Sequence, residues 1–171
     1  PLRSKDCIMG LPNLSEKDLN RVAVGNRLMS FSAGVFNLCL SLMIGIAMGN
    51  PHSSRIWQAP AMFALSRRQQ LFFDYTDFCM DRMSWRKRTR IMYAFVDLSC
   101  VFKHCCSLKG ICDRSGSNHV VLSGSLNGVF MTLIAEPYPV ALCNRIARAF
   151  HNYVCNRHVR SLATMCMPDG M

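Results

Sequence analysis

The sequence predicts a single α/β domain with a largely parallel sheet, flanking helices and a cysteine-rich loop. Helical and strand patterns alternate along the chain, which is typical of a sheet whose strands are joined by helices. The 171 residues suffice for one domain with a core, and a hydrophobic content of 50% excludes a disordered chain. We expect residues 1–14 to form an irregular arm and residues 15–171 to form the domain.

The first part of the chain predicts a long helix followed by a short buried strand. Ser15 and Asp18 match an N-cap and N3 pair, so a helix is expected over about 16–42, with a strand over 44–48. Residues 28–48 carry no formal charge and are long enough to cross a bilayer. The serine, asparagine and glycine residues within them favour a buried helix and strand, so no membrane partner is expected.

The middle of the chain predicts a short helix and two strands. Pro60 suits the first turn of a helix over 61–70. Aromatic and branched residues predict strands over 71–75 and 90–96, and the polar, basic residues 76–89 predict a loop between them.

The last third predicts a loop-rich stretch and a second long helix. Residues 97–128 are rich in cysteine, glycine and serine, with a small strand expected over 119–122. Apolar positions at helical spacing predict a helix over about 139–167, with Arg145 and Arg148 on or near its polar face.

Charge and cysteine usage bound the partners and the compartment. Twenty lysine and arginine residues against ten acidic residues give a net charge of +10, which is typical of a domain that meets a polyanion such as nucleic acid. Several of the ten cysteines lie in apolar helical patterns, where cysteine acts as a small hydrophobic residue. We therefore expect an intracellular protein of the nucleus or an organelle, with nucleic acid and other protein chains as partners.

The stretch GNPHSSRIW, residues 49–57, follows a predicted strand. Ligands of parallel α/β sheets sit at the carboxyl ends of strands, so this stretch and the loop after residues 71–75 are expected to share one edge and one ligand. Asn50 and Ser53 are candidates for hydrogen bonds to a substrate, and Arg55 is a candidate for a phosphate contact. The alternative is an ordinary turn, because Asn-Pro and Ser-Ser are common turn pairs.

The basic stretch SWRKRTR, residues 84–90, is the second candidate nucleic-acid site. Cationic side chains beside an aromatic ring suit phosphate binding with base or sugar stacking. The alternative is a solvated loop that keeps the edge of the sheet soluble. The candidate contact residues are Trp85, Arg86, Lys87, Arg88 and Arg90.

The cysteine-rich stretch holds a candidate zinc site. Cys106, Cys112 and His119 can act as ligands. The candidate fourth ligands are Cys100, His104 and Cys105. The spacing C-x5-C-x6-H matches no standard zinc finger, so free thiols in a loop are the favoured expectation and zinc is the alternative.

Several segments together resemble divergent cytosine-5 DNA methyltransferases of the retroelement and viral type. IAMGNPHSSRIW resembles the strand end of that family that carries Glu-Asn, and FFDYTDFCMDRMSWRKRTRIMYAFV resembles its Gln-x-Arg-x-Arg region. GLPNLSEKDLNRVAVGN, HVVLSG and AEPYPVALCNRIA are similar to neighbouring parts, so the resemblance spans roughly residues 10–150. It implies the C-terminal part of the catalytic domain, with part of a Rossmann-like methyltransferase sheet.

The chain departs from that family at the chemical groups. It lacks the Phe-x-Gly-x-Gly turn that holds S-adenosylmethionine and the Pro-Cys nucleophile. Gly49 stands where the family has a catalytic Glu, while the neighbouring Asn50 is retained, and Trp85 stands where Gln is expected. Without a nucleophile and an acid, attack on cytosine loses orders of magnitude in rate.

These departures predict a degenerate, inactive methyltransferase-like domain that binds RNA or DNA, for example as a structural component of a ribonucleoprotein such as an organellar ribosome. One alternative is a fragment of an active S-adenosylmethionine-dependent DNA cytosine-5 methyltransferase that another chain completes. Another is a small zinc-binding module in which the cysteine loop is the working part.

Overall fold

A computed structural model of the chain describes residues 2–102, 105–107 and 110–165. Five helices are present in this part: α1 (Glu16–Ser41), α2 (Pro60–Ser66), α3 (Ser99–Phe102), α4 (Met131–Ile134) and α5 (Val140–Met165). The strands are β1 (Ile46–Pro51), β2 (Phe72–Asp77) and β3 (Arg88–Ala94), with a small hairpin of β4 (Ser125–Leu126) and β5 (Val129–Phe130). Two 3-10 turns, η1 (Arg55–Gln58) and η2 (Phe78–Asp81), follow β1 and β2.

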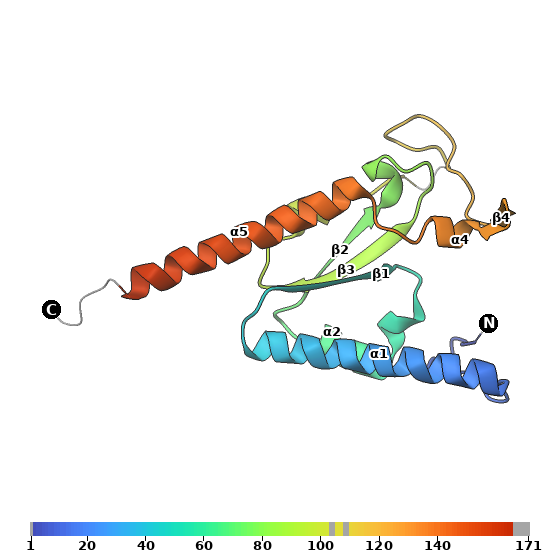
Figure 1. Cartoon of the computed structure of the whole chain (residues 1–171), viewed down its shortest axis with the longest axis horizontal. Helices are drawn as coiled ribbons and strands as arrows, with labels where there is room; N and C mark the ends of the chain where they lie inside the picture. The colour runs from blue at the N-terminus through green and yellow to red at the C-terminus, as the bar shows by residue number, and fades with distance from the viewer. Residues whose placement is uncertain (1, 103–104, 108–109, 166–171) are drawn as a thin grey trace.

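The structure has three layers, with helices α1 and α2 on one face of the sheet and α5 across the other (Figure 1). Successive side chains of a strand point to opposite faces, and β3 uses both. Met92 and Ala94 pack with α1 and α2, whereas Ile91 and Tyr93 pack beneath α5. The central strand therefore contributes to two hydrophobic cores at once.

The main sheet has the order β1-β3-β2, and both outer strands run antiparallel to β3. The mixed α/β class is confirmed. The prediction of a largely parallel sheet is wrong for the described strands, and a Rossmann-like sheet is not confirmed. Strands β1 and β2 do run in the same direction with α2 between them, as the alternation predicts. However, β3 returns through a loop rather than a helix and inserts between them.

This arrangement brings the ends of β1 and β2 to the same edge of the sheet. Pro51 and Thr76 both lie opposite Thr89 of β3. The rings of His52 and Tyr75 meet edge to face, with their centroids 5.0 Å apart. The expectation that the two strand ends share one edge is therefore confirmed.

The long helices, α2 and the three strands of the main sheet are predicted, with bounds that differ from the observed ones by a few residues. Ser15 caps α1 and accepts a hydrogen bond from the backbone N–H of Asp18, as expected. Strand β3 begins at Arg88, two residues before the predicted start. The strand predicted over 119–122 is wrong. Helix α3 and strand β4 lie within the stretch predicted as a loop, 97–128, and β5 and α4 directly follow it.

The uncharged residues 28–48 are divided among α1, a turn and β1. Within the described ranges, no helix combines the length and the apolar character that crossing a bilayer requires.

Gly49 lies where β1 passes beneath the ring of Tyr138. A Cβ atom at Gly49 would overlap the Tyr138 hydroxyl and come within 2.7 Å of the Ile91 Cδ1 atom. The position that the resemblance assigns to a catalytic acid therefore has no room for a side chain. Tyr138 itself is packed against Phe78, with ring centroids 5.2 Å apart.

We predict that Gly49→Ala lowers the free energy of unfolding by about 1–3 kcal/mol, because the added methyl group overpacks this contact. Urea denaturation measures the change. Gly34→Ala is the matched control: Gly34 is exposed on helix α1 and a Cβ there meets nothing within 4 Å, so this change stabilises by about 1 kcal/mol. Equal effects of the two substitutions would contradict the close approach at Gly49.

Candidate metal centre

Four side chains with metal-binding atoms converge beyond the end of β2. They are Cys79, Cys106, Cys112 and His119, and their ligand atoms all lie within 4.8 Å of one another. Cys79 belongs to the turn η2 that directly follows β2, and the other three belong to the cysteine-rich loop. The three cysteines are free thiols with almost no exposed surface.

The set of donor atoms and the spacing of one ligand pair fit tetrahedral zinc. Zinc bonds of 2.3 Å to sulfur and about 2.05 Å to nitrogen place two sulfur ligands about 3.8 Å apart, and sulfur and nitrogen about 3.6 Å apart. The Sγ atom of Cys106 lies 3.5 Å from Nε2 of His119. Three thiolates and one imidazole fill all four positions of zinc, and such closed sites are structural rather than catalytic.

The loop between two of the ligands folds back on itself. The N–H of Cys112 donates to the carbonyl of Ser117 at 2.8 Å, and the N–H of Gly116 donates to the carbonyl of Cys112 at 2.8 Å. Gly116 has φ +68°, in the left-handed region that favours glycine. A bridge between Ile111 and Asn118 closes the turn. This local hairpin brings Cys112 and His119 to the same side.

The pKa values of two of the thiols, Cys79 and Cys112, shift in opposite directions. Burial, together with a hydrogen bond to Cys106 and the charges of Cys106 and Cys112, raises the pKa of Cys79. Burial also acts to raise the pKa of Cys112, but hydrogen bonds from Ser115, Arg114 and His119 outweigh it and lower that pKa to about 6. A divalent cation would relieve the repulsion among these sulfurs and displace the Cys79 proton.

Asp77 anchors the cysteine loop to the sheet. Its side chain is completely buried and accepts hydrogen bonds from Arg88 Nε at 3.1 Å, Arg88 Nη2 at 2.7 Å and the Cys106 N–H at 2.8 Å. Arg86 Nε forms an ion pair with the same carboxylate at 3.2 Å. Arg88 Nη2 also donates to the carbonyl of Cys106 at 3.2 Å. One carboxylate therefore connects β2, β3 and a metal ligand.

The remaining residues of the basic stretch also have partners inside the protein. Lys87 Nζ donates to the carbonyl of Ala135 at 2.8 Å and packs over the Phe78 ring. Burial lowers the pKa of Lys87. Trp85 packs in the core beneath α5. Arg86, Lys87 and Arg88 are only partly buried, so their internal partners do not close them off from a ligand. Their contact with nucleic acid stays a prediction.

Arg90 is held between aromatic rings. Its guanidinium carbon lies 4.2 Å from the ring centroid of Phe73 and 5.0 Å from that of Trp57. Such cation–π contacts stabilise partly buried arginines. Arg90 therefore stabilises the contact between the sheet and η1.

The stretch GNPHSSRIW divides its candidate residues between two hollows. Asn50 and Arg55 line one of about 330 Å³, and Ser53 and Arg90 line another of about 770 Å³. Arg55 bonds to Gln58 at 3.4 Å. The candidate nucleic-acid residues of this stretch are thus not gathered in a single pocket.

The structure brings together the three metal ligands proposed from the sequence and adds Cys79. The candidate Cys105 is exposed, and its thiol approaches the carbonyl of Tyr75 rather than the cluster. The side chain of Cys100 and the whole of His104 lie outside the described residues. Cys79 was missed because it lies 27 positions before Cys106. Its place directly after a strand end was the available signal.

The chain matches no protein-family model, no curated protein and no solved structure. The resemblance to cytosine-5 DNA methyltransferases therefore stays an expectation from the sequence.

We predict about one zinc ion per chain in protein purified without chelators. Cys79→Ser should abolish zinc binding and lower Tm by more than about 10 °C, because several kcal/mol of metal binding are coupled to folding and each shifts Tm by about 2–4 °C at this size. Cys105→Ser is the matched control and should retain zinc. Elemental analysis and thermal melts measure both. Zinc retained in the Cys79 variant would contradict the proposed ligand set.

We also predict that Asp77→Asn lowers the free energy of unfolding by about 3 kcal/mol. This is the lower end for breaking a buried ion pair, since Arg88 is partly exposed. The control Asp18→Asn removes an exposed partner of Arg21 and should cost less than about 1 kcal/mol. Urea denaturation of both variants measures the difference. If the two losses agree within error, Asp77 is not an anchor.

Proposed function

We propose that this chain is a zinc-stabilised domain that binds nucleic acid and performs no methyl transfer of its own. The observation that carries the proposal is the charge balance of 20 cationic against 10 acidic residues. Two of the acids, Asp77 and Asp81, are buried in ion pairs with arginines. Because these two acids are buried, fewer carboxylates remain at the surface. A surface with an excess of cations attracts the phosphate backbone of nucleic acid.

Zinc in this proposal has a structural role. After α3, the described part of the cysteine-rich loop contributes few large apolar side chains, and its buried residues are the ligands Cys106 and Cys112. A closed zinc site supplies the stability that such a loop cannot obtain from hydrophobic burial. The metal would thus fix the loop against the end of the sheet that carries the basic stretch.

Exposed cations without internal partners are available for phosphate contacts. Arg68 and Arg148 are exposed, and their side chains form no hydrogen bond or ion pair with any other described residue. By contrast, the arginines at 86 and 88 share Asp77. Phosphate contacts from the first group would cost no internal interaction, which favours them as the primary contacts.

The absence of methyl transfer in the proposal rests on the sequence and on the packing at Gly49. The chain contains no Pro-Cys pair, and Tyr138 fills the space that an acid at position 49 would need. A methyltransferase-like ancestry without its chemistry is compatible with a binding component of a ribonucleoprotein.

We predict that the chain binds a labelled 20-nucleotide single strand with strong salt dependence. With about four phosphate contacts, the slope of log K against log salt should be about −3. Fluorescence anisotropy at several salt concentrations gives this slope. An acidic peptide of equal charge is the control ligand and should bind more weakly. No binding at about 50 mM salt, or equal affinity for the peptide, would contradict nucleic-acid recognition.

A further inference from the structure

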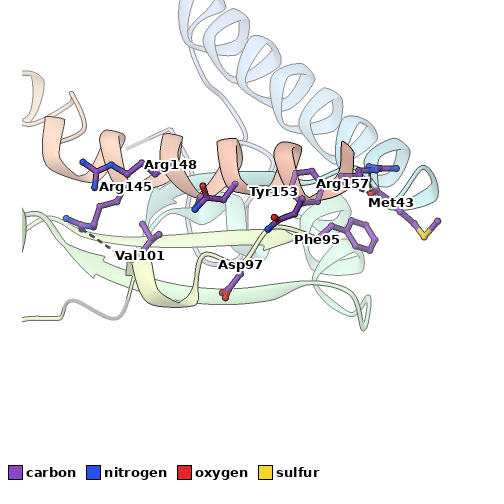
Figure 2. Close-up of a pocket in the computed structure, with 11 residues that line it drawn as sticks. Met43, Phe95, Asp97, Val101, Arg145, Arg148, Tyr153 and Arg157 are labelled. Atoms are coloured by element: carbon purple, nitrogen blue, oxygen red, sulfur yellow. Dashed lines mark hydrogen bonds between the residues drawn. The ribbon is translucent and has the colours of Figure 1, made fainter. Parts of the chain in front are cut away.

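A groove of about 770 Å³ lies beneath α5, between this helix, the segment from Phe95 to Val101 and Met43 in the turn that follows α1 (Figure 2). Three arginines line it, Arg145, Arg148 and Arg157, against the single acid Asp97. In Figure 2, Asp97 points away from α5, and its carboxylate accepts hydrogen bonds from Ser99. Arg145 is also paired with the buried Asp81, but the arginines still outnumber the acids, so the groove is positively charged.

The arginines occupy the two ends of the groove. Figure 2 shows Arg145 and Arg148 together at one end, and Arg157 beside Met43 and Phe95 at the other. Arg157 lies nine positions after Arg148 in α5, which corresponds to about 13 Å along a helix. A stacked strand advances about 3.4 Å per nucleotide, so the two ends are about four nucleotide steps apart.

Donors remain free at both ends. Arg148 has no hydrogen-bond or ion-pair partner among the residues that the structure describes. Arg157 uses only Nη1 for its bonds to the Met43 carbonyl and the Tyr153 hydroxyl, each at 2.8 Å, although a guanidinium carries five N–H donors. Arg145 adds no free donor of this kind, because Nη1 and Nη2 bond to Asp81 and to the Val101 carbonyl and its Nε is buried.

The middle of the groove offers amides along one row of the helix. Asn152 and Asn156 follow Arg148 at four-residue intervals, so the three side chains lie on one face of α5. Each asparagine presents two donors and one acceptor group, which suit the edges of unpaired bases. Both amides are exposed and form no hydrogen bond with another described side chain.

Backbone strain is concentrated at the apolar end. Phe95 and Met43 have φ of 61° and 51°, a left-handed conformation that is unfavourable for large side chains. Such strained residues persist where the surrounding structure imposes them, often at binding sites. The half-buried ring of Phe95 provides a surface on which a base can stack.

We propose that this groove binds a short segment of single-stranded nucleic acid, with phosphates at the arginines and a base against Phe95. A duplex keeps its bases stacked inside and presents mainly phosphates, so the aromatic and amide lining would have no partner. A single strand presents both phosphates and base faces. The inference rests on the proposed nucleic-acid function and assigns it a site.

Fluorescence anisotropy of the full chain with labelled oligothymidine, oligouridine and a duplex of equal length tests the groove. Wild-type protein should bind one of the single strands at least about 10-fold more tightly than the duplex, because stacking adds to the phosphate contacts. Arg148→Ala should weaken single-strand binding and reduce the magnitude of the salt slope by about 0.7, the contribution of one phosphate. The matched control Arg27→Ala removes an equal charge from an exposed position of α1, outside the groove, and should leave affinity within about twofold.

A second variant tests stacking. Phe95→Asn removes the ring but tolerates the left-handed backbone, and it should weaken single-strand binding by at least about fivefold without affecting duplex binding. Thermal melts establish whether each variant is folded. If Phe95→Asn does not fold, the comparison of the exposed Arg148 with Arg27 decides the question.

The outcomes separate this inference from the broader function. Equal losses in the Arg148 and Arg27 variants, or equal affinity for single strand and duplex, would overturn the groove while leaving nucleic-acid binding intact. No binding to any oligonucleotide would overturn both.

Discussion

The buried carboxylate of Asp77 is the interaction on which the rest of the structure depends. It lies at the end of β2 with no exposed surface, so its charge must be balanced inside the protein. Arg86 and Arg88 balance it from β3 and the segment before it, and the N–H of Cys106 completes its hydrogen bonding. The register of β2 with β3 and the position of the cysteine-rich loop are therefore determined together.

The turn η2 connects the candidate metal centre to the groove. It carries Cys79 and, two residues later, Asp81, whose buried side chain pairs with Arg145 of α5. The metal would thus help to fix both the cysteine-rich loop and one end of the groove. Arg114 reinforces the same turn, because its Nε donates to the carbonyl of Cys79 at 2.6 Å. Stability and ligand binding are linked here through one short segment.

Elements whose signals are local could be predicted from the sequence. Helix α1 has its N-cap at Ser15 and is predicted to within one residue at its end. Helix α5 has apolar residues at helical spacing and is predicted over its described length, while residues 166 and 167 of that prediction lie outside the described residues. The position of β3 could not be predicted, because alternation of helix and strand does not reveal which strand inserts between two others. The fourth ligand Cys79 was also missed, since only the fold brings it to Cys106, which lies 27 residues later in the chain.

The basic stretch shows why charge alone does not identify a site. Its arginines suggest phosphate contacts, yet the structure gives Arg86 and Arg88 a buried carboxylate and Arg90 two aromatic rings. A sequence cannot show which of its acids will be buried, so it cannot distinguish structural cations from free ones. The groove arginines lie within a helix whose sequence has the pattern of an ordinary amphipathic segment. Only the packing of α5 over Phe95 and Met43 reveals the concave surface.

We propose that Cys79 and the cysteine-rich loop close a four-ligand zinc centre at the end of the sheet. X-ray absorption at the zinc edge of the purified chain tests it most directly. We expect three sulfur ligands at about 2.3 Å and one nitrogen ligand at about 2.0–2.1 Å, with no water bound. A spectrum with two or fewer sulfur ligands, or with oxygen ligands in their place, would contradict the proposed centre.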